Sequence, residues 1–182
     1  MNLFSERGFD RTTVDEIANQ ASVGKGTIYL YFENKEQIFL AIIEEGLNEF
    51  NQKLSEAISQ STDYLHGFEV MILTQFQFIE THSEFYRIFS KERLSLRLCT
   101  DDRARSRIHV IHQRMQQIMS DYIYTGMRQG YLRQGDPNEF AWAVSGIITH
   151  FAFHWIMEGG VGSLVAKKAT VLELVLNGVK KV

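Results

Sequence analysis

Residues 10–36 read DRTTVDEIANQASVGKGTIYLYFENKE, and this stretch decides the fold at the start of the chain. Thr13 is followed three residues later by Glu16, which is the spacing of a capping box. A capping box satisfies the free amides at the start of a helix, so we predict a helix from there through Ala21. Its buried face is expected to consist of Val14, Ile17 and Ala18.

A second short helix is predicted at 25–31, after a turn made by the Ser-Val-Gly sequence at 22–24. A connection this short forces the two helices to fold back on each other at a steep angle. Val23 and Ile28 are expected to wedge between them, with Phe32 closing the far end. The predicted arrangement is a helix-turn-helix, whose second helix enters the major groove of DNA.

The outer face of the second helix carries residue types that suit a major groove. Gly26 has no side chain, so the backbone there can approach the duplex closely. Lys25 can reach a guanine edge or a phosphate, and Thr27 can bond a base or place its methyl group against thymine. The phenols of tyrosines can donate to phosphate oxygens. The full outer face comprises Lys25, Gly26, Thr27, Tyr29, Leu30 and Tyr31.

Two residues beside this helix are candidates for phosphate contacts. Thr13 and Lys35 each lie at the start of a predicted helix, where free amides and the helix dipole favour an anion. The composition does not support DNA binding, because the net charge of the chain is −3. Residues 1–36 carry four basic and six acidic side chains. The DNA hypothesis therefore depends on pattern and not on charge.

The remainder of the chain is predicted to be all-α, with one proline and apolar residues at helical spacing. Asn34 is a predicted N-cap, with Gln37 as its reciprocal partner. A lone cysteine, the lack of an N-terminal signal sequence, and the lack of an apolar run near the roughly 20 residues that span a bilayer favour the cytoplasm. Helices are predicted at 35–59, 63–80, 83–97, 102–129, 137–157 and 163–180.

The predicted helix at 137–157 is apolar nearly all round, which requires burial on every side. A body of this size rarely supplies that burial alone, so we predict that part of the helix meets another subunit. The alternative is a central core helix of a monomer.

The segment LFSERGFDRTTVDEIANQASVGKGTIYLYFENKEQIF, within a match over about 3–45, resembles the N-terminal domain of the TetR family of transcriptional regulators. GDPNEFAWAV at 135–144 resembles the same family at its penultimate helix. The chain departs from the family in two places: only 2–7 of the first helix is expected to remain, and Gly24 stands where a capping serine or threonine is common. The resemblance implies DNA contacts at Thr13, Lys25, Gly26, Thr27, Tyr29, Tyr31 and Lys35.

The resemblance further implies an all-helical homodimer that dimerises through its last two helices. It implies a DNA-binding domain at 1–45 and a ligand-binding and dimerisation domain at 46–182. Members usually repress and leave a palindromic operator when a small molecule binds, with no cofactor. Activation instead of repression stays open, as does a helical ligand-binding or interaction protein with impaired DNA binding.

Aromatic and methionine side chains crowd the predicted body, and such a set suits an adaptable pocket for an apolar or aromatic effector. Ordinary core packing is the alternative for each of them. A ligand there would shift the population of subunit arrangements, with the helix at 35–59 as the lever. The candidate pocket residues are Phe68, Met71, Phe76, Phe89, His112, Met115, Met119, Tyr122, Phe151 and Trp155.

Other functional classes find less support. Arg103, Arg107 and Arg114 share a predicted helix face, which suits either solvent or an anionic effector. His150, His154 and Glu158 form a stripe too long for one metal ion, so no metal site is predicted. We find no glycine-rich phosphate loop, nucleophile elbow or apolar carboxylate pair, so the sequence predicts no enzyme.

Overall fold

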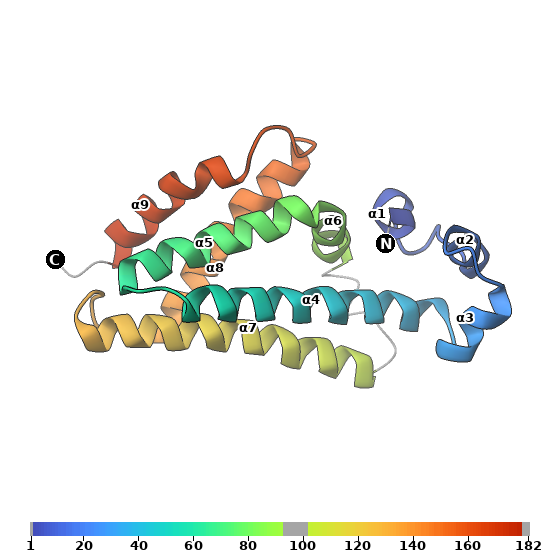
Figure 1. Cartoon of the computed structure of the whole chain (residues 1–182), viewed down its shortest axis with the longest axis horizontal. Coiled ribbons are helices and arrows are strands. Elements are labelled where there is room, and N and C mark those ends of the chain that lie inside the picture. Colours follow the sequence, from blue (N-terminus) through green and yellow to red (C-terminus); the bar gives the residue numbers. More distant parts are fainter. Residues whose placement is uncertain (1, 93–101, 180–182) are drawn as a thin grey trace. The chain divides into compact units, whose positions relative to one another are not determined.

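The computed structural model describes residues 2–92 and 102–179, and these residues form helices with no strand among them (Figure 1). The chain divides into two compact units. The first comprises Met1–Asn48 and Glu84–Ile111, and the second comprises Glu49–Ser83 and His112–Val182. The all-α prediction is confirmed.

The first unit is built on the start of the long helix α4. Ile38, Phe39, Leu40 and Ile43 of α4 are buried, as expected for the residues that anchor it. The aromatic ring of Phe4 joins them. The helices that contribute to this unit are α1 (Asn2–Arg7), α2 (Val14–Gln20), α3 (Lys25–Tyr31), α4 (Lys35–Ser59, in part), α6 (Ser83–Glu92) and α7 (Asp102–Gln129, in part).

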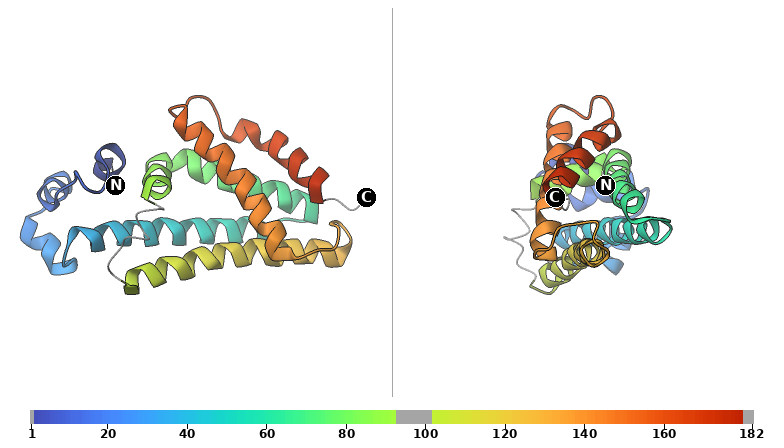
Figure 2. Two further views of the ribbon diagram at one scale, coloured as in Figure 1. Left: turned by 180° about the vertical axis from the view of Figure 1, so that it is seen from behind. Right: turned by 90° about the vertical axis from the view of Figure 1, so that its left-hand side faces the viewer.

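The second unit is organised around α5 (Tyr64–Thr81), which packs against α8 (Pro137–Met157) and α9 (Lys168–Val179). Figures 1 and 2 show these three helices lying together, and α8 and α9 also contact each other. The rest of α4 and α7 belongs to the same unit. Its fully buried side chains include Leu54, Phe68, Met71, Ile72, Phe76, Met119 and Ile123.

An aromatic stack joins α5 to the end of α7. The Tyr64 ring lies between Tyr122, at 4.8 Å between centroids, and Tyr131, at 5.0 Å. Burial raises the pKa of the Tyr64 phenol far above its usual range and that of Tyr122 to about 12. Two glycines make room, because a Cβ at Gly67 would lie 2.0 Å from the Tyr122 hydroxyl and one at Gly126 would lie 2.2 Å from the Tyr64 ring.

Most helix bounds match the sequence predictions, and the clearest difference lies at the C-terminal end. A single helix was expected over 163–180, whereas the structure has a 3-10 turn, Val165–Lys167, before α9 begins at Lys168. One Glu80 carboxylate oxygen accepts hydrogen bonds from the Ser163 hydroxyl and the Val165 amide, both at 2.9 Å. These bonds to α5 fix a separate entry turn ahead of α9. Residues 93–97 of the expected helix at 83–97 lie outside the described residues.

The cap of α4 also differs from the expected reciprocal box. Asn34 accepts a hydrogen bond from the Gln37 amide at 2.9 Å, as predicted. The Gln37 side chain, however, accepts from the amide of Glu33 at 3.0 Å, one residue earlier than expected. Its amide nitrogen then donates to the Glu33 carboxylate, which holds it away from Asn34.

Helix α8 begins as the sequence suggests, with Asp136 accepting from the Asn138 amide and Pro137 in the first turn. Its length of 21 residues and its composition are sufficient to cross a membrane, so the expectation that no such run exists is wrong. The same composition suits a helix buried between subunits. Trp142, Phe153 and Met157 of this helix are exposed in the single chain.

Candidate nucleic-acid interface

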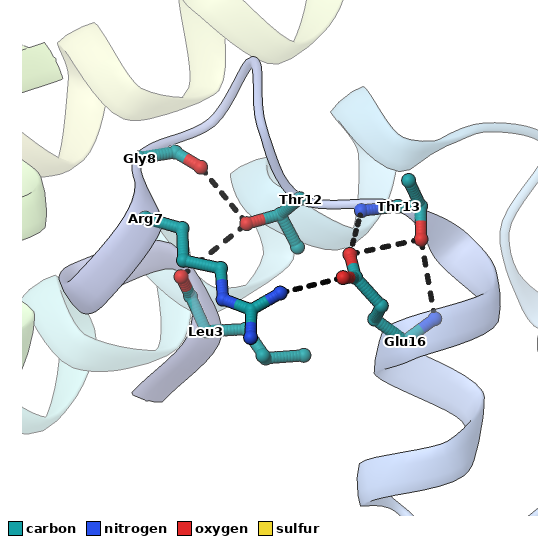
Figure 3. A network of polar contacts seen from close by, with 6 residues as sticks. All are labelled: Leu3, Arg7, Gly8, Thr12, Thr13 and Glu16. Atoms are coloured by element: carbon teal, nitrogen blue, oxygen red, sulfur yellow. Dashed lines mark hydrogen bonds and ion pairs between the residues drawn. The ribbon is translucent and has the colours of Figure 1, made fainter.

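The capping box predicted at the start of α2 is present (Figure 3). The Thr13 hydroxyl accepts from the Glu16 amide at 3.3 Å and donates to the Glu16 carboxylate at 2.9 Å. The Thr13 amide donates to the same carboxylate oxygen at 2.9 Å. These hydrogen bonds hold the pKa of Glu16 below its usual value. The bond from the Thr13 amide contributes most, and the bond from the Thr13 hydroxyl comes next.

Glu16 also connects α2 to α1. Its other carboxylate oxygen lies 2.6 Å from the Arg7 guanidinium, which lowers the pKa of Glu16 further. The carboxylate therefore occupies the anion position at the start of α2 that was expected to attract a phosphate. A DNA contact at Thr13 stays a prediction.

Thr12 is a structural residue that the sequence reasoning missed. It is 1% exposed, and its hydroxyl donates to the carbonyl oxygens of Gly8 at 2.8 Å and Leu3 at 3.3 Å (Figure 3). These bonds fix the loop between α1 and α2. The Thr-Thr pair in the quoted segment was the available signal, because a buried hydroxyl requires a partner.

Lys35 is held inside the head, here defined as residues 2–39. Its ammonium donates to the carbonyl oxygens of Phe9 at 2.6 Å and Asp10 at 3.2 Å, and it lies 4.4 Å from the centroid of the Phe9 ring. That ring contacts Phe4 and Phe39, at 6.0 and 5.1 Å between centroids. The observed role of Lys35 is to hold the α1–α2 loop onto α4, and the phosphate contact stays a prediction.

The turn between α2 and α3 is held by the backbone. Ser22 has a left-handed conformation, with φ of 56°, and the Val23 amide donates to the Ala18 carbonyl at 3.0 Å. The expected wedge is wrong for Val23, whose side chain is 38% exposed. Ile28 and Phe32 are half-buried, and α3 contacts α2. Because Ile28 is the one half-buried residue of α3, its side of the helix is taken as the side that packs on α2.

Helix α3 is largely exposed to solvent, because six of its seven residues are exposed and Ile28 is half-buried. Five of the seven predicted DNA contacts lie on it. A Cβ at Gly26 would meet nothing within 4 Å, so the close approach that it was expected to permit is open. These five exposed residues are Lys25, Gly26, Thr27, Tyr29 and Tyr31.

Lys25 is already engaged by an acid. Its ammonium lies 2.8 Å from the Asp15 carboxylate of α2, and this hydrogen bond raises the pKa of Lys25. Both side chains are about half exposed, at 49% and 61%. An exposed pair of this kind is weak and is exchanged easily for a stronger anion such as a phosphate.

The candidate pocket residues differ in their burial and in their hydrogen bonds. Nine of the ten belong to the second unit, and the side chain of Phe89 lies outside the described part. The Tyr122 hydroxyl donates to the Tyr64 carbonyl at 2.6 Å, and the Trp155 indole to the Gly162 carbonyl at 3.0 Å. Phe68, Met71, Phe76 and Met119 are fully buried, while His112, Met115, Tyr122, Phe151 and Trp155 are half-buried.

Among the described residues, no group of three metal-ligating side chains lies close enough to hold an ion. His154 and Glu158 are paired with each other at 3.4 Å. Of the three arginines that share a predicted face, Arg107 forms an ion pair with Glu44 at 2.9 Å. Arg114 is exposed, and the side chain of Arg103 lies outside the described part.

Two family models together match almost the whole chain. Residues 1–42 match the model described as "Bacterial regulatory proteins, tetR family", and residues 43–178 match "YsiA-like protein, C-terminal region". The fatty acid metabolism regulator protein of Bacillus subtilis is 27% identical over 180 residues, which cover 98% of this chain and 91% of that protein. The transcriptional repressor KstR2 of Mycobacterium tuberculosis is 24% identical over 98% of this chain and 88% of its own length.

The chain is also similar in structure to proteins whose structures have been solved. A crystal structure of the transcriptional regulator FadR from Bacillus subtilis in complex with stearoyl-CoA superimposes with a TM-score of 0.84 at 28% identity, covering 97% of this chain and 94% of that one. The helix-turn-helix geometry of α2 and α3 agrees with these matches. The chain belongs to the tetR family of bacterial regulatory proteins, and it is a DNA-binding transcriptional regulator and not an enzyme.

Proposed function

We propose that this regulator represses transcription from a palindromic operator, which it binds as a homodimer and releases when an acyl-CoA or a similar long-chain ligand binds. The observation that carries the proposal is the solvent-exposed face of α3, a helix that contacts α2 and follows a short turn in which the Val23 amide donates to the Ala18 carbonyl. We place this activity in the cytoplasm, where a bacterial operator is found.

We assign the DNA contacts chiefly to α3. Tyr29 and Tyr31 are 48% and 77% exposed and carry hydroxyls that can donate to phosphates. Lys25 can exchange Asp15 for a phosphate or a guanine edge. Thr13 and Lys35 are engaged within the head and are assigned to positioning α2 and the loop before it.

The homodimer is proposed to form through α8 and α9. Trp142 and Met157 of α8 are 62% and 68% exposed, and Leu174 of α9 is 54% exposed. Large apolar side chains this exposed on neighbouring helices are typical of a surface that a partner covers. A dimer also presents two heads to successive major grooves, about 34 Å apart.

The effector is proposed from two lines of support. FadR from Bacillus subtilis, at 28% identity, was crystallised with stearoyl-CoA. The interior of the second unit contains the fully buried side chains of Phe68, Met71, Phe76 and Met119, and methionine with aromatic side chains adapts readily to an acyl chain. The domain boundary near residue 45 is proposed to separate DNA reading from this ligand-binding part.

The test is selection of binding sites from a random DNA duplex pool by the purified full chain. We expect one palindrome, and we expect Tyr29→Ala to weaken binding to it by roughly 10-fold or more, since phosphate and base contacts each contribute of order 1–3 kcal/mol. Tyr124→Ala is the matched control, because Tyr124 is 52% exposed on α7, in the second unit. Recovery of no sequence would favour the helical interaction protein instead.

The effector is tested on the same operator. We expect stearoyl-CoA to release the protein at micromolar concentration while coenzyme A alone leaves the complex intact. Release by neither compound, with the operator still bound, would contradict the acyl-CoA assignment and leave DNA binding intact.

A further inference from the structure

Leu30 is 81% exposed, the largest exposed fraction among the large apolar side chains that the structure describes. It lies on α3, as the last residue but one of that helix. A single exposed leucine on an ordinary surface needs no explanation. This one lies on the helix that a helix-turn-helix protein inserts into the major groove, where it would meet the edges of base pairs.

The position of Leu30 on the helix points it away from α2. Residues two apart on a helix lie on opposite sides, and Ile28, two residues earlier, is the half-buried residue that faces α2. Residues three and four apart share a side, so Leu30 lies on one strip with Thr27 and Gly26. The open space around Gly26 lets the strip approach a surface closely.

This strip carries no charge. The nearest cation on the helix, the Lys25 ammonium, lies 2.8 Å from Asp15. Leucine has no hydrogen-bonding group, so it cannot read the donors and acceptors of guanine, cytosine or adenine. The one apolar group that a base pair displays in the major groove is the C5 methyl of thymine.

We propose that Leu30 reads thymine in each half of the operator by packing against its C5 methyl group. The inference rests on the proposed operator binding and adds a specificity-determining residue to it. It places a thymine at the base step that faces the Gly26–Leu30 strip.

The test removes one methyl group from the DNA and the leucine side chain from the protein, singly and together. Each thymine of the selected operator is replaced in turn by deoxyuridine, which lacks only the C5 methyl, and the Kd is measured by fluorescence anisotropy. For the wild-type chain we expect one symmetric pair of replacements to weaken binding by roughly 3- to 10-fold, the range expected when a methyl contact is lost from each half-site.

Leu30→Ala should weaken binding to the unmodified operator by a similar factor. It should then be insensitive to that same pair of replacements, because the two changes remove one shared contact. Leu65→Ala, at a leucine 44% exposed on α5, is the matched control and should keep the full response to deoxyuridine. Thermal unfolding of both variants checks that an exposed substitution leaves the fold unchanged.

The outcomes separate this inference from the function on which it rests. A wild-type chain that binds its palindrome but responds to no deoxyuridine overturns the reading by Leu30 and leaves the regulator intact. The same holds if Leu30→Ala still responds in full. A chain that selects no palindrome overturns both.

Discussion

The acids of the head govern what its basic residues can do. Asp15 holds Lys25, and Glu16 holds both Arg7 and the first turn of α2. In a segment with more acidic than basic residues, two of the acids nearest the predicted DNA contacts are thus used for contacts within the head. The face of α3 is left uncharged except for one exchangeable lysine.

Asp15→Asn should therefore tighten operator binding, because it frees Lys25 and removes a negative charge near the phosphates. We expect the slope of log K against log salt concentration to steepen by about 0.9 for each additional phosphate contact. Anisotropy titrations over a salt series measure this slope. Asp121→Asn, which makes the same charge change on α7, should leave the slope unchanged; an unchanged slope for Asp15→Asn would contradict the role given to this pair.

Glu16 makes the stability of the head pH-dependent. Its pKa in the folded chain lies below the ordinary value of 4.5, so its contribution is complete above that value and is lost as the pH falls through the folded-state pKa. Between roughly pH 6 and pH 3, the thermal midpoint of the wild-type chain should fall more steeply than that of Glu16→Gln. Glu56→Gln, at an exposed site in the second unit, should follow the wild type. Parallel curves for Glu16→Gln and the wild type would contradict this prediction.

At the scale of the elements, helices α5 and α7 are brought together by glycines that receive tyrosine rings. The hydroxyl of Tyr122 and the ring of Tyr64 occupy the space that side chains at Gly67 and Gly126 would fill. The contact therefore depends on two positions that helix propensity alone would disfavour.

Gly126→Ala should destabilise the chain by about 1–3 kcal/mol, the usual cost of forcing a methyl group into a packed site. Chemical denaturation measures the loss. Gly26→Ala makes the same change in a helix where nothing lies within 4 Å, so it should be neutral or stabilising by up to about 1 kcal/mol. It should nevertheless weaken operator binding, because the new Cβ projects from the strip that faces the duplex. Equal stability of both variants would show that Tyr64 moves aside freely.

At the scale of the whole molecule, the exposed apolar residues of α8 and α9 are the feature that a single chain leaves unexplained. Trp142, Phe153 and Met157 lie on a helix whose most apolar window is only 28% buried. Water contact over such a surface is costly, at about 25 cal/mol per Å² of apolar area. A second copy of the chain would remove that cost.

Met157→Glu should shift the protein from dimer to monomer in sedimentation velocity, because a carboxylate buried at the interface is strongly disfavoured. Operator affinity should fall by at least roughly 10-fold, since one head binds only one half-site. Tyr124→Glu places the same charge at another exposed site, on α7, and should stay dimeric. A Met157→Glu dimer of unchanged affinity would place the interface elsewhere.

Local sequence patterns by themselves determined the helices and the helix-turn-helix. The Thr13–Glu16 spacing, the glycine before Lys25 and the apolar period of 35–59 act within a few residues, so they can be recognised without a tertiary structure. Capping and periodicity therefore predicted the bounds of α4, α7 and α8. Short-range turn signals predicted the turn between α2 and α3. The family resemblance was likewise carried by short, contiguous motifs.

Only the tertiary structure decided which of those side chains are exposed and which are already bonded within the chain. Lys25 and Lys35 look alike in the sequence, yet one meets an exposed carboxylate, and the other meets two carbonyl groups 25 and 26 residues away. Val23 was expected to be buried between α2 and α3 because it is apolar, yet it is 38% exposed, and burial does not follow from residue type alone. Long-range partners set these outcomes because hydrogen bonding and burial depend on distance in space, which local spacing does not encode.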